Sequence, residues 1–432
     1  MAEPEMTGNG PVITQPPLGR TVYLTSDSEL GNHLLETRGL QWIHAANGDP
    51  YAVVLRGQLD DPYPEYERVR ALGPLSLSAT GSWVTADHAV AAEILCSPDF
   101  GMSAADGRPV PQQVVSYGSA NPLESGGAER HGRAAEPGPE TVGRHRALVE
   151  RIHQEVVERT LAAGPEKDRV DVHGAGPHGF ELMADFIRPA VTAATAAVLG
   201  VPQERRAQFG TCVERLRPLP DSLLAAQSLR TVRAAGDALA ELDALPATGA
   251  GETPGGTVGD EHPPLRGPLC ALGVATAVHL TGNAVLSLLA HPDQWRQLCA
   301  RPELAAAAVE ETLRHDPPVQ LDARIALREV TLAGHRLRPG THVVVLTAGT
   351  GRDPAAFTEP ERFDLTRQDA ARHLALHETG AHGPVAPLVR LQAEAALRAL
   401  AGRFPTLRPA GPVLRLRRSP VSRGPLSVPV TG

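Results

Sequence analysis

Most of the chain repeats hydrophobic positions at the three- and four-residue spacing of amphipathic helices. The pattern predicts helices at about 26–39, 62–71, 89–96, 144–163, 178–199, 202–216, 222–243, 292–300, 302–315 and 385–403. The longest apolar stretch, 269–290, contains His279 and Asn283, which would be costly in hydrocarbon. We therefore expect a buried core helix there and not a membrane span.

Three other stretches read as strands. SWVTADH at 82–88 precedes a helix that Asp87 can cap, and residues 324–347 alternate between apolar and polar around two Gly-containing turns. Short strands are expected again in 413–430, after the last helix. The sequence thus predicts a mainly α fold with a smaller β portion.

Two long segments, 101–143 and 244–266, have no hydrophobic period and are rich in Gly and Pro. We expect mobile loops there, inserted into one domain that covers residues 21–432. The first 20 residues are expected to form a disordered tail. They lack the basic and apolar regions of a secretory signal.

Composition narrows the function classes. With 41 Lys and Arg against 49 Asp and Glu, the net charge is −8, which argues against nucleic-acid or anionic-membrane binding. The four cysteines are far apart and form no CxxC pair, so neither a zinc site nor a disulfide framework is indicated. A cytoplasmic location fits this cysteine usage best.

No motif by itself indicates catalysis. His377 and His382 are five residues apart with Thr379-Gly380 between them, which is not the i, i+4 spacing of a zinc-binding helix. We therefore expect His373, His377 and His382 to be loop histidines and to bind no metal. Neither a Gly-x-Ser-x-Gly elbow nor a P-loop occurs. A basic run near the C-terminus is interpreted as a solvated strand face, with a partner-facing patch as the alternative. It comprises Arg415, Arg417, Arg418 and Arg423.

From about residue 60 onward the sequence resembles the bacterial cytochromes P-450. Glu311 and Arg314 form the Glu-x-x-Arg pair in AVEETLRHDPPVQ, and GRDPAAFTEPERFD follows with Arg362 at the position of the second arginine. The resemblance implies the P-450 fold, with 269–290 as its central helix. It also implies that these three side chains form a buried ionic and hydrogen-bond network.

The residues that hold and use haem in that family are replaced. HLALHETGAHGPVAPLVRLQAE matches the cysteine loop, and Gly383 stands where the axial thiolate belongs. The acid-alcohol pair of the central helix matches Ala275 and Thr276, which leaves only the alcohol. His145 matches the propionate-binding histidine, but Val149 replaces its arginine partner. The resemblance therefore implies no cofactor and no catalytic residue.

Three further positions bear on haem. Val385 replaces the glycine that lets the next helix approach the porphyrin, whereas Arg324 keeps a cation for a propionate. His382 is next to Gly383, and an imidazole is a competent haem ligand. A haem-binding oxidoreductase with a non-cysteine ligand is therefore the alternative function.

A narrower resemblance extends over nearly the whole chain. TRGLQWIHAANGDPYAVVLRGQLDDPYPEY, SWVTADHA and PVLRLRRSPVSRG resemble the cysteine-less P-450-like auxiliary proteins of antibiotic biosynthesis. The resemblance implies a non-catalytic protein that binds, stabilises and activates a glycosyltransferase. Such transferases attach TDP-activated deoxysugars, often amino sugars, to macrolide or anthracycline aglycones.

A partner of this kind needs a specific contact surface. The candidates are Leu30, Leu34 and Leu35 on the N-terminal helix, with the neighbouring Trp42. A short amphipathic helix outside the family core can dock in a groove of another protein. The alternative is that this stripe packs on its own domain.

Overall fold

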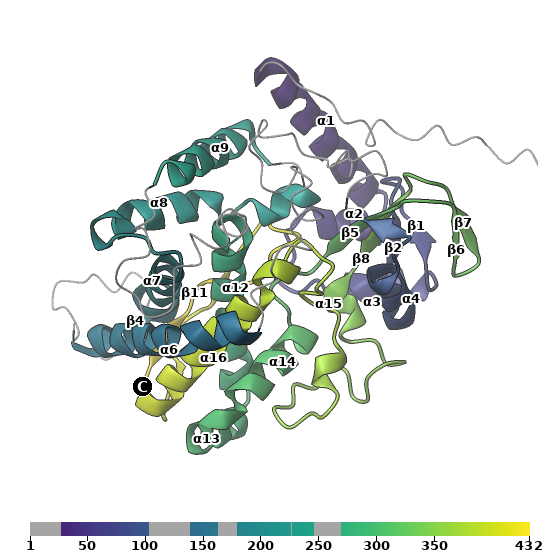
Figure 1. Ribbon diagram of the computed structural model, residues 1–432. Helices are drawn as coiled ribbons and strands as arrows, with labels where there is room; N and C mark the ends of the chain where they lie inside the picture. The colour runs from purple at the N-terminus through teal and green to yellow at the C-terminus, as the bar shows by residue number, and fades with distance from the viewer. Residues whose placement is uncertain (1–26, 103–138, 163–178, 226, 246–268) are drawn as a thin grey trace, which may run out of the picture.

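The computed structural model describes residues 27–102, 139–162, 179–225, 227–245 and 269–432 (Figure 1). Helices make up most of this part of the chain, and small sheets lie mainly at one side. The expected N-terminal tail and most of the two expected loops lie outside the described residues.

The helices share one body in which α12 runs through the middle (Figure 1). The α-helices are α1 (Asp27–Ala46), α2 (Pro50–Leu55), α3 (Tyr63–Ala71), α4 (His88–Cys96), α6 (Pro139–Ala162), α7 (Arg188–Val198), α8 (Arg206–Leu216), α9 (Leu229–Asp243), α12 (Val274–Leu289), α13 (Pro292–Ala300), α14 (Ala305–His315), α15 (Thr347–Thr350) and α16 (Ala386–Arg403). Shorter 3₁₀ or π segments are η2 (Leu182–Ile187), η3 (Gln203–Arg205), η4 (Pro220–Leu223), η6 (Leu269–Gly273), η7 (Pro302–Leu304), η8 (Ala370–Arg372) and η9 (Gly383–Val385).

The strands form one five-stranded sheet and three smaller pairings. The larger sheet has the order β1-β2-β8-β5-β3, in which β2 and β8 are parallel and the other pairs are antiparallel. The smaller sheets are β4-β12-β9, β10-β11 and β6-β7. The bounds are β1 (Ser76–Leu77), β2 (Trp83–Thr85), β3 (Phe100–Gly101), β4 (Gly179–Glu181), β5 (Asp322–Ala326), β6 (Val330–Leu332), β7 (His335–Leu337), β8 (His342–Val345), β9 (Arg408–Pro409), β10 (Leu414–Arg415), β11 (Pro425–Ser427) and β12 (Pro429–Thr431).

The predicted core helix is present as α12 with the π segment η6 before it. It packs against α7, α14 and α16, and nearly all of its side chains are buried. Asn283 donates from Nδ2 to the carbonyls of Asp316 and Arg423, both at 3.0 Å, so the buried amide nitrogen is satisfied. No single described helix is long and apolar enough to cross a membrane. Only α12 and α13 together reach that length, and they meet at a bend of 110°.

The N-terminal helix is longer than predicted. It continues through Gly39, which was expected to end it, and stops at Ala46 before Asn47 and Gly48. A helical glycine costs only about 1 kcal/mol, which the packing of α1 on α2 and α9 outweighs. Gly48 instead takes the left-handed conformation (φ +89°) that ends the helix.

Other predicted helix starts agree with the structure. Asp87 accepts a hydrogen bond from the Val90 amide at 2.9 Å and caps α4. The Asp61 carboxylate accepts from the Tyr63 amide at the start of α3. By contrast, α6 begins at Pro139, five residues before the predicted position. The mainly α composition with a smaller β portion is confirmed.

Candidate functional site

Glu311 and Arg314 form the buried ion pair that their spacing predicts. Both lie on α14 with fully buried side chains, and two hydrogen bonds of 2.7 and 2.8 Å join them. Arg314 also donates to the carbonyls of Gly351, Pro360 and Arg362. The guanidinium thus ties α14 to the chain between α15 and η8.

The second arginine of the network is Arg367, and the prediction of Arg362 was wrong. Arg367 is nearly buried and lies 3.3 Å from Glu311 through its Nε, while the Asp364 amide donates to the same carboxylate at 2.8 Å. The Arg362 side chain is 60% exposed and pairs with Glu359 and Asp364. Only its backbone carbonyl joins the network. Arg362 and Arg367 are five residues apart in an irregular segment, and the motif alone does not reveal which of the two side chains points inward.

The loop that would carry an axial ligand is closed around Gly383. A Cβ atom built on Gly383 would lie 2.1 Å from the Glu378 carbonyl oxygen, so even the first atom of a cysteine side chain does not fit. The Gly383 amide donates to Gly380 O at 3.0 Å and holds this tight turn. Val385, two residues on, is fully buried in the hydrophobic core. The residues present therefore do not fit a thiolate-ligated haem.

The cation kept for a propionate already has a partner. Arg324 on β5 is buried and forms an ion pair with Asp322, and its Nη2 donates to Thr379 Oγ1 at 3.3 Å. Within α6, Val149 is fully buried in the core and the neighbouring Glu150 pairs with Arg398 of α16 at 3.2 Å. These contacts join protein elements to one another and leave no free cation of this set for an anionic cofactor.

The remaining central-helix alcohol is also used internally. Thr276 Oγ1 donates to the Leu272 carbonyl one turn earlier at 2.7 Å, and Ala275 beside it carries no proton-transfer group. His145 on α6 is half-buried and has a contact of its own, so it is not a free ligand. Position 149, where the family has a second propionate-binding residue, is a valine with no polar atom.

One nearby group retains an unused nitrogen. His382 is buried, burial lowers its pKa to about 4, and its Nε2 has no hydrogen-bond partner within the described residues. The imidazole is therefore neutral at neutral pH. His373 and His377 instead contact Glu310 and Thr379, at 2.9 and 3.0 Å. No group of three potential metal ligands occurs in the described ranges.

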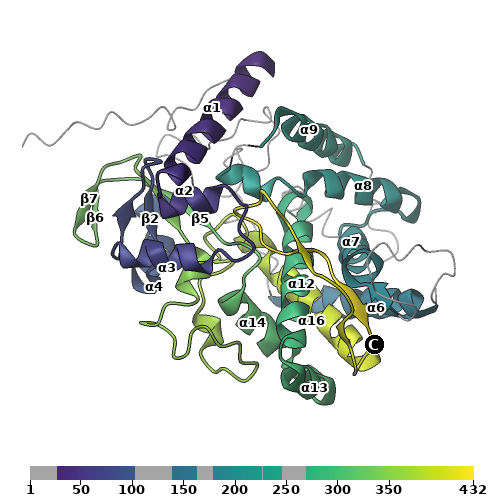
Figure 2. The same cartoon turned by 180° about the vertical axis from the view of Figure 1, so that it is seen from behind.

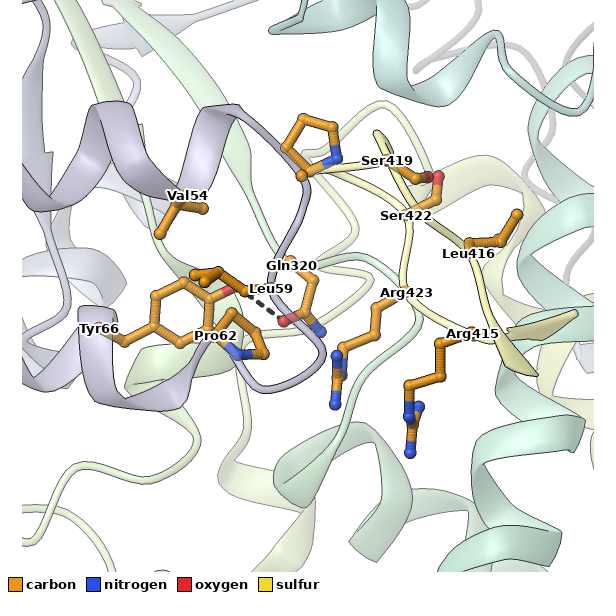
Figure 3. A pocket seen from close by; sticks show the side chains of 13 residues that line it. Val54, Leu59, Pro62, Tyr66, Gln320, Arg415, Leu416, Ser419, Ser422 and Arg423 are labelled. Atoms are coloured by element: carbon orange, nitrogen blue, oxygen red, sulfur yellow. Dashed lines mark hydrogen bonds between the residues drawn. The ribbon is translucent and has the colours of Figure 1, made fainter. Parts of the chain in front are cut away.

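The arginines near the C-terminus differ in role: two form ion pairs inside the fold and two are exposed at the surface. Arg423 donates to Asp316 at 2.7 Å, and Tyr63 OH donates to the same carboxylate at 3.0 Å. Burial would raise the pKa of Asp316, but Arg423 and Arg415 outweigh this effect and lower it. The two guanidiniums extend in the same direction from the C-terminal segment, beside a small pocket of about 30 Å³ in which Tyr66 donates to Gln320 (Figure 3).

That pocket has room for only a water or two. The interpretation of the whole run as a solvated strand face is therefore wrong for Arg415 and Arg423, which fix the C-terminal segment to Asp316. Arg417, by contrast, is exposed and pairs with Asp60 at 3.2 Å. Arg418 is exposed and faces a different hollow, which α1 also lines.

The candidate partner-binding residues divide between two faces of α1. Leu34 is only 3% exposed and packs on its own domain, so it is a core residue and not the partner-binding residue that was predicted. Leu35 and Trp42 are 69% and 47% exposed. Leu30 lies in α1, but its side chain is outside what the structure describes. Among the three candidates whose side chains the structure describes, the alternative of self-packing thus holds for Leu34.

Sequence reasoning missed Ile43, which is 56% exposed. It follows Leu35 by eight residues, which places it about 80° around the helix from Leu35 and within the width of one apolar face. The sequence hides this signal because Gly39 predicts the end of the helix before Ile43. Leu35, Trp42 and Ile43 form the exposed apolar strip of α1.

Comparisons with known proteins place the chain with the P-450 family and its relatives. The family model described as Cytochrome P450 matches residues 290–381. "Protein DesVIII" of Streptomyces venezuelae is 65% identical over 99% of both chains. "Cytochrome P450 family protein EryCII" of Saccharopolyspora erythraea is 35% identical, over 94% of this chain and 99% of the relative. Among solved structures, epothilone D-bound cytochrome P450epoK matches with a TM-score of 0.69 and 25% identity, covering 86% of this chain and 96% of that one. The predicted P-450 fold is confirmed.

Proposed function

The chain belongs to the cytochrome P450 family, and we propose that it is a non-catalytic member of it. In this proposal it binds, stabilises and activates a glycosyltransferase in the cytoplasm. The transferase attaches a TDP-activated deoxysugar, typically an amino sugar, to a macrolide or anthracycline aglycone. The two proteins form a hetero-oligomer, and neither nucleic acid nor a membrane takes part.

The observation that carries the proposal is the closed turn at Gly383. Position 383 has no side chain to supply an axial sulfur, and the Glu378 carbonyl occupies the space that the first atom of a side chain would need. Arg324 is neutralised by Asp322, and Thr276 is committed to the helix backbone. A P-450 fold without these three functions has lost oxygen chemistry but keeps a large, well-packed body. The full-length similarity to DesVIII supports the same role.

Activation then requires only binding energy. A partner that binds the folded, competent transferase and not its unfolded or inactive forms raises the population of the competent state. The stabilisation is RT ln(1 + [L]/Kd), or about 2.7 kcal/mol at a hundredfold excess over Kd. Stabilisation and a change of conformation are both accommodated by this scheme.

A second candidate function rests on His382. Its neutral, unpartnered Nε2 is the kind of nitrogen that ligates haem iron, which would favour a haem-binding oxidoreductase. The closed turn, Val385 and the paired Arg324 weigh against this function, because the macrocycle would also need space and a free cation.

A visible spectrum and a co-expression experiment separate the two functions. The chain purified from haem-supplemented cells is expected to lack a stoichiometric Soret band. Co-expressed with the transferase encoded beside it, it is expected to co-purify with that enzyme and to raise its soluble yield or turnover. A stoichiometric Soret band without association would overturn the auxiliary role.

Gly383→Cys tests whether a missing sulfur is the sole defect. Because the added Cβ meets the Glu378 carbonyl, we expect a lower melting temperature and still no haem. Gly402→Cys on α16 is the matched control, since its Cβ would have no neighbour within 4 Å. A stable, haem-loaded Gly383→Cys protein would contradict this interpretation of the turn.

A further inference from the structure

A hollow of about 170 Å³ lies between α1, the end of α2, the start of α9 and the C-terminal segment. Arg38 lines it from α1, Arg56 from the end of α2 and Arg418 from the C-terminal segment. Ser228 caps α9 beside it, and none of the described residues that line the hollow is acidic. The hollow is far larger than the space of one water, so it has room for side chains of another molecule.

The three arginines have no carboxylate partner among the described residues. Within the described part of the chain, no carboxylate lies within 4 Å of Arg38, Arg56 or Arg418, although the protein as a whole has a net charge of −8. Arg56 lies over the ring of Trp42 at 4.1 Å and donates to Gln58 at 2.9 Å, which leaves its buried Nε without a partner. Like charges in one hollow repel each other until an anion enters.

The position of Arg418 is also held in an unusual backbone conformation. Its φ is +60°, a left-handed value that favours glycine, and its amide donates to Gly57 O. Gly57 has to be a glycine here, because a Cβ would lie 2.5 Å from the Ser419 amide nitrogen. The chain thus brings this arginine to the hollow at a cost in backbone strain.

The apolar strip of α1 adjoins the hollow. Trp42 belongs to both, and Leu35 and Ile43 continue the apolar surface around the helix. Gly39 lies between them, and a Cβ there would meet nothing within 4 Å, so the centre of the strip is open. In both views α1 projects from one end of the molecule, opposite α13 (Figures 1 and 2). Exposed apolar surface of this kind usually marks an interface.

We infer that this hollow and the apolar strip of α1 together form the docking surface for the glycosyltransferase. The occupant is a transferase segment whose carboxylates enter the hollow and whose adjacent apolar side chains cover the strip. Charge complementarity favours an acidic segment, because the three guanidiniums have no carboxylate partner among the described residues. A free small anion would neutralise the arginines but leave Leu35 and Ile43 exposed. The inference rests on the proposed function and specifies its surface.

Charge reversal tests the hollow. The double variant Arg38→Glu, Arg418→Glu is titrated with the transferase encoded beside the chain, and its Kd is compared with that of the wild type. We expect Kd to rise at least about tenfold and its salt dependence to weaken. The control is Arg296→Glu, Arg336→Glu, which makes the same charge change at arginines that are 70% and 74% exposed elsewhere. Equal Kd values for the two double variants would overturn the inference.

A steric variant tests the strip without disturbing the core. Gly39→Gln places a side chain in the open centre of the strip, and glutamine favours a helix more than glycine does. We expect Kd to rise at least about tenfold with no loss of melting temperature. Gly402→Gln on α16 has equally open surroundings and should bind like the wild type. Wild-type affinity of Gly39→Gln would contradict the inference.

The same measurements separate other occupants from the transferase. If the wild-type chain does not bind the transferase at all, both the proposed function and the docking surface are overturned. If it binds and every surface variant binds equally, only the docking surface fails. A dimer of the chain alone that Gly39→Gln dissociates would identify a second copy as the occupant. A melting temperature that pyrophosphate raises in the wild type only, with no effect of the arginine variants on transferase affinity, would identify a small-anion site.

Discussion

At the scale of single residues, the best-defined feature is the buried network around Glu311. Its carboxylate accepts hydrogen bonds from Arg314, Arg367 and the Asp364 amide, so a charge removed from water is fully paired. Removing one partner from such a network leaves an uncompensated buried charge. The network is therefore sensitive to which arginine is replaced.

Arg367→Ala is expected to lower the free energy of unfolding by about 2–4 kcal/mol. The side chain is nearly buried and donates to Glu311 and to the carbonyls of Thr358 and Glu359. Arg362→Ala, at a 60% exposed side chain, should change that free energy by less than about 0.5 kcal/mol. Urea unfolding of the two variants gives the comparison. A larger loss of the free energy of unfolding in Arg362→Ala than in Arg367→Ala would mean that Arg362 is the second arginine of the network.

At the scale of elements, α1 shows how one helix divides its roles. Its inner side, which includes Leu34, packs against the domain, while Leu35 one position later faces solvent. The packing partners of α1 include α2 and α9. Stability and docking on α1 therefore depend on different, adjacent residues.

Leu34→Ala is expected to loosen α1, whereas Leu35→Ala should leave it intact. Removing a buried leucine side chain typically costs about 2–5 kcal/mol, and removing one that is 69% exposed costs little. Amide hydrogen exchange along Asp27–Ala46 measures the difference, with faster exchange expected in Leu34→Ala only. Equal exchange in both variants would mean that the inner side of α1 is not packed as described.

At the scale of the whole molecule, buried and half-buried histidines link stability to pH. Burial lowers their pKa to about 3 or 4 in the folded protein. They are His153, His279, His315, His342 and His382. A histidine with a lowered folded pKa contributes stability above its unfolded pKa of about 6.5, and that stability is lost as pH falls toward the folded value. Asp221, whose pKa burial raises to about 6, acts in the opposite direction.

The free energy of unfolding is therefore expected to fall steeply between pH 7 and pH 5. Each such histidine contributes about 2 kcal/mol to this loss, because the unfolded state binds the proton and the folded state does not. His279→Gln should remove about that amount of the difference between pH 7 and pH 5. Urea unfolding at the two pH values, in wild type and variant, measures it. A parallel loss in both proteins would show that His279 is not buried and neutral.

Much of the element order could be predicted because it follows from local pattern. The core helix, the capped start of α4 and the strands around β5 to β8 agree with the sequence within a few residues. The end of α1 could not be predicted, because whether a helix continues through a glycine depends on whether the residues after it pack against other elements. For the same reason, the sequence predicts Leu35 and Trp42 as candidates but not Ile43. Leu35 and Ile43 lie on one face only if the helix continues through Gly39.

The sequence by itself determined that positions 383 and 149 supply no ligand, because glycine and valine side chains have no ligating atom in any fold. The tertiary structure alone decided that the turn at Gly383 is closed, that Arg367 completes the network and that Leu34 faces inward. It also brought Arg38, Arg56 and Arg418 into one hollow from three distant segments. These outcomes depend on side-chain direction and long-range approach, which the local hydrophobic pattern does not encode.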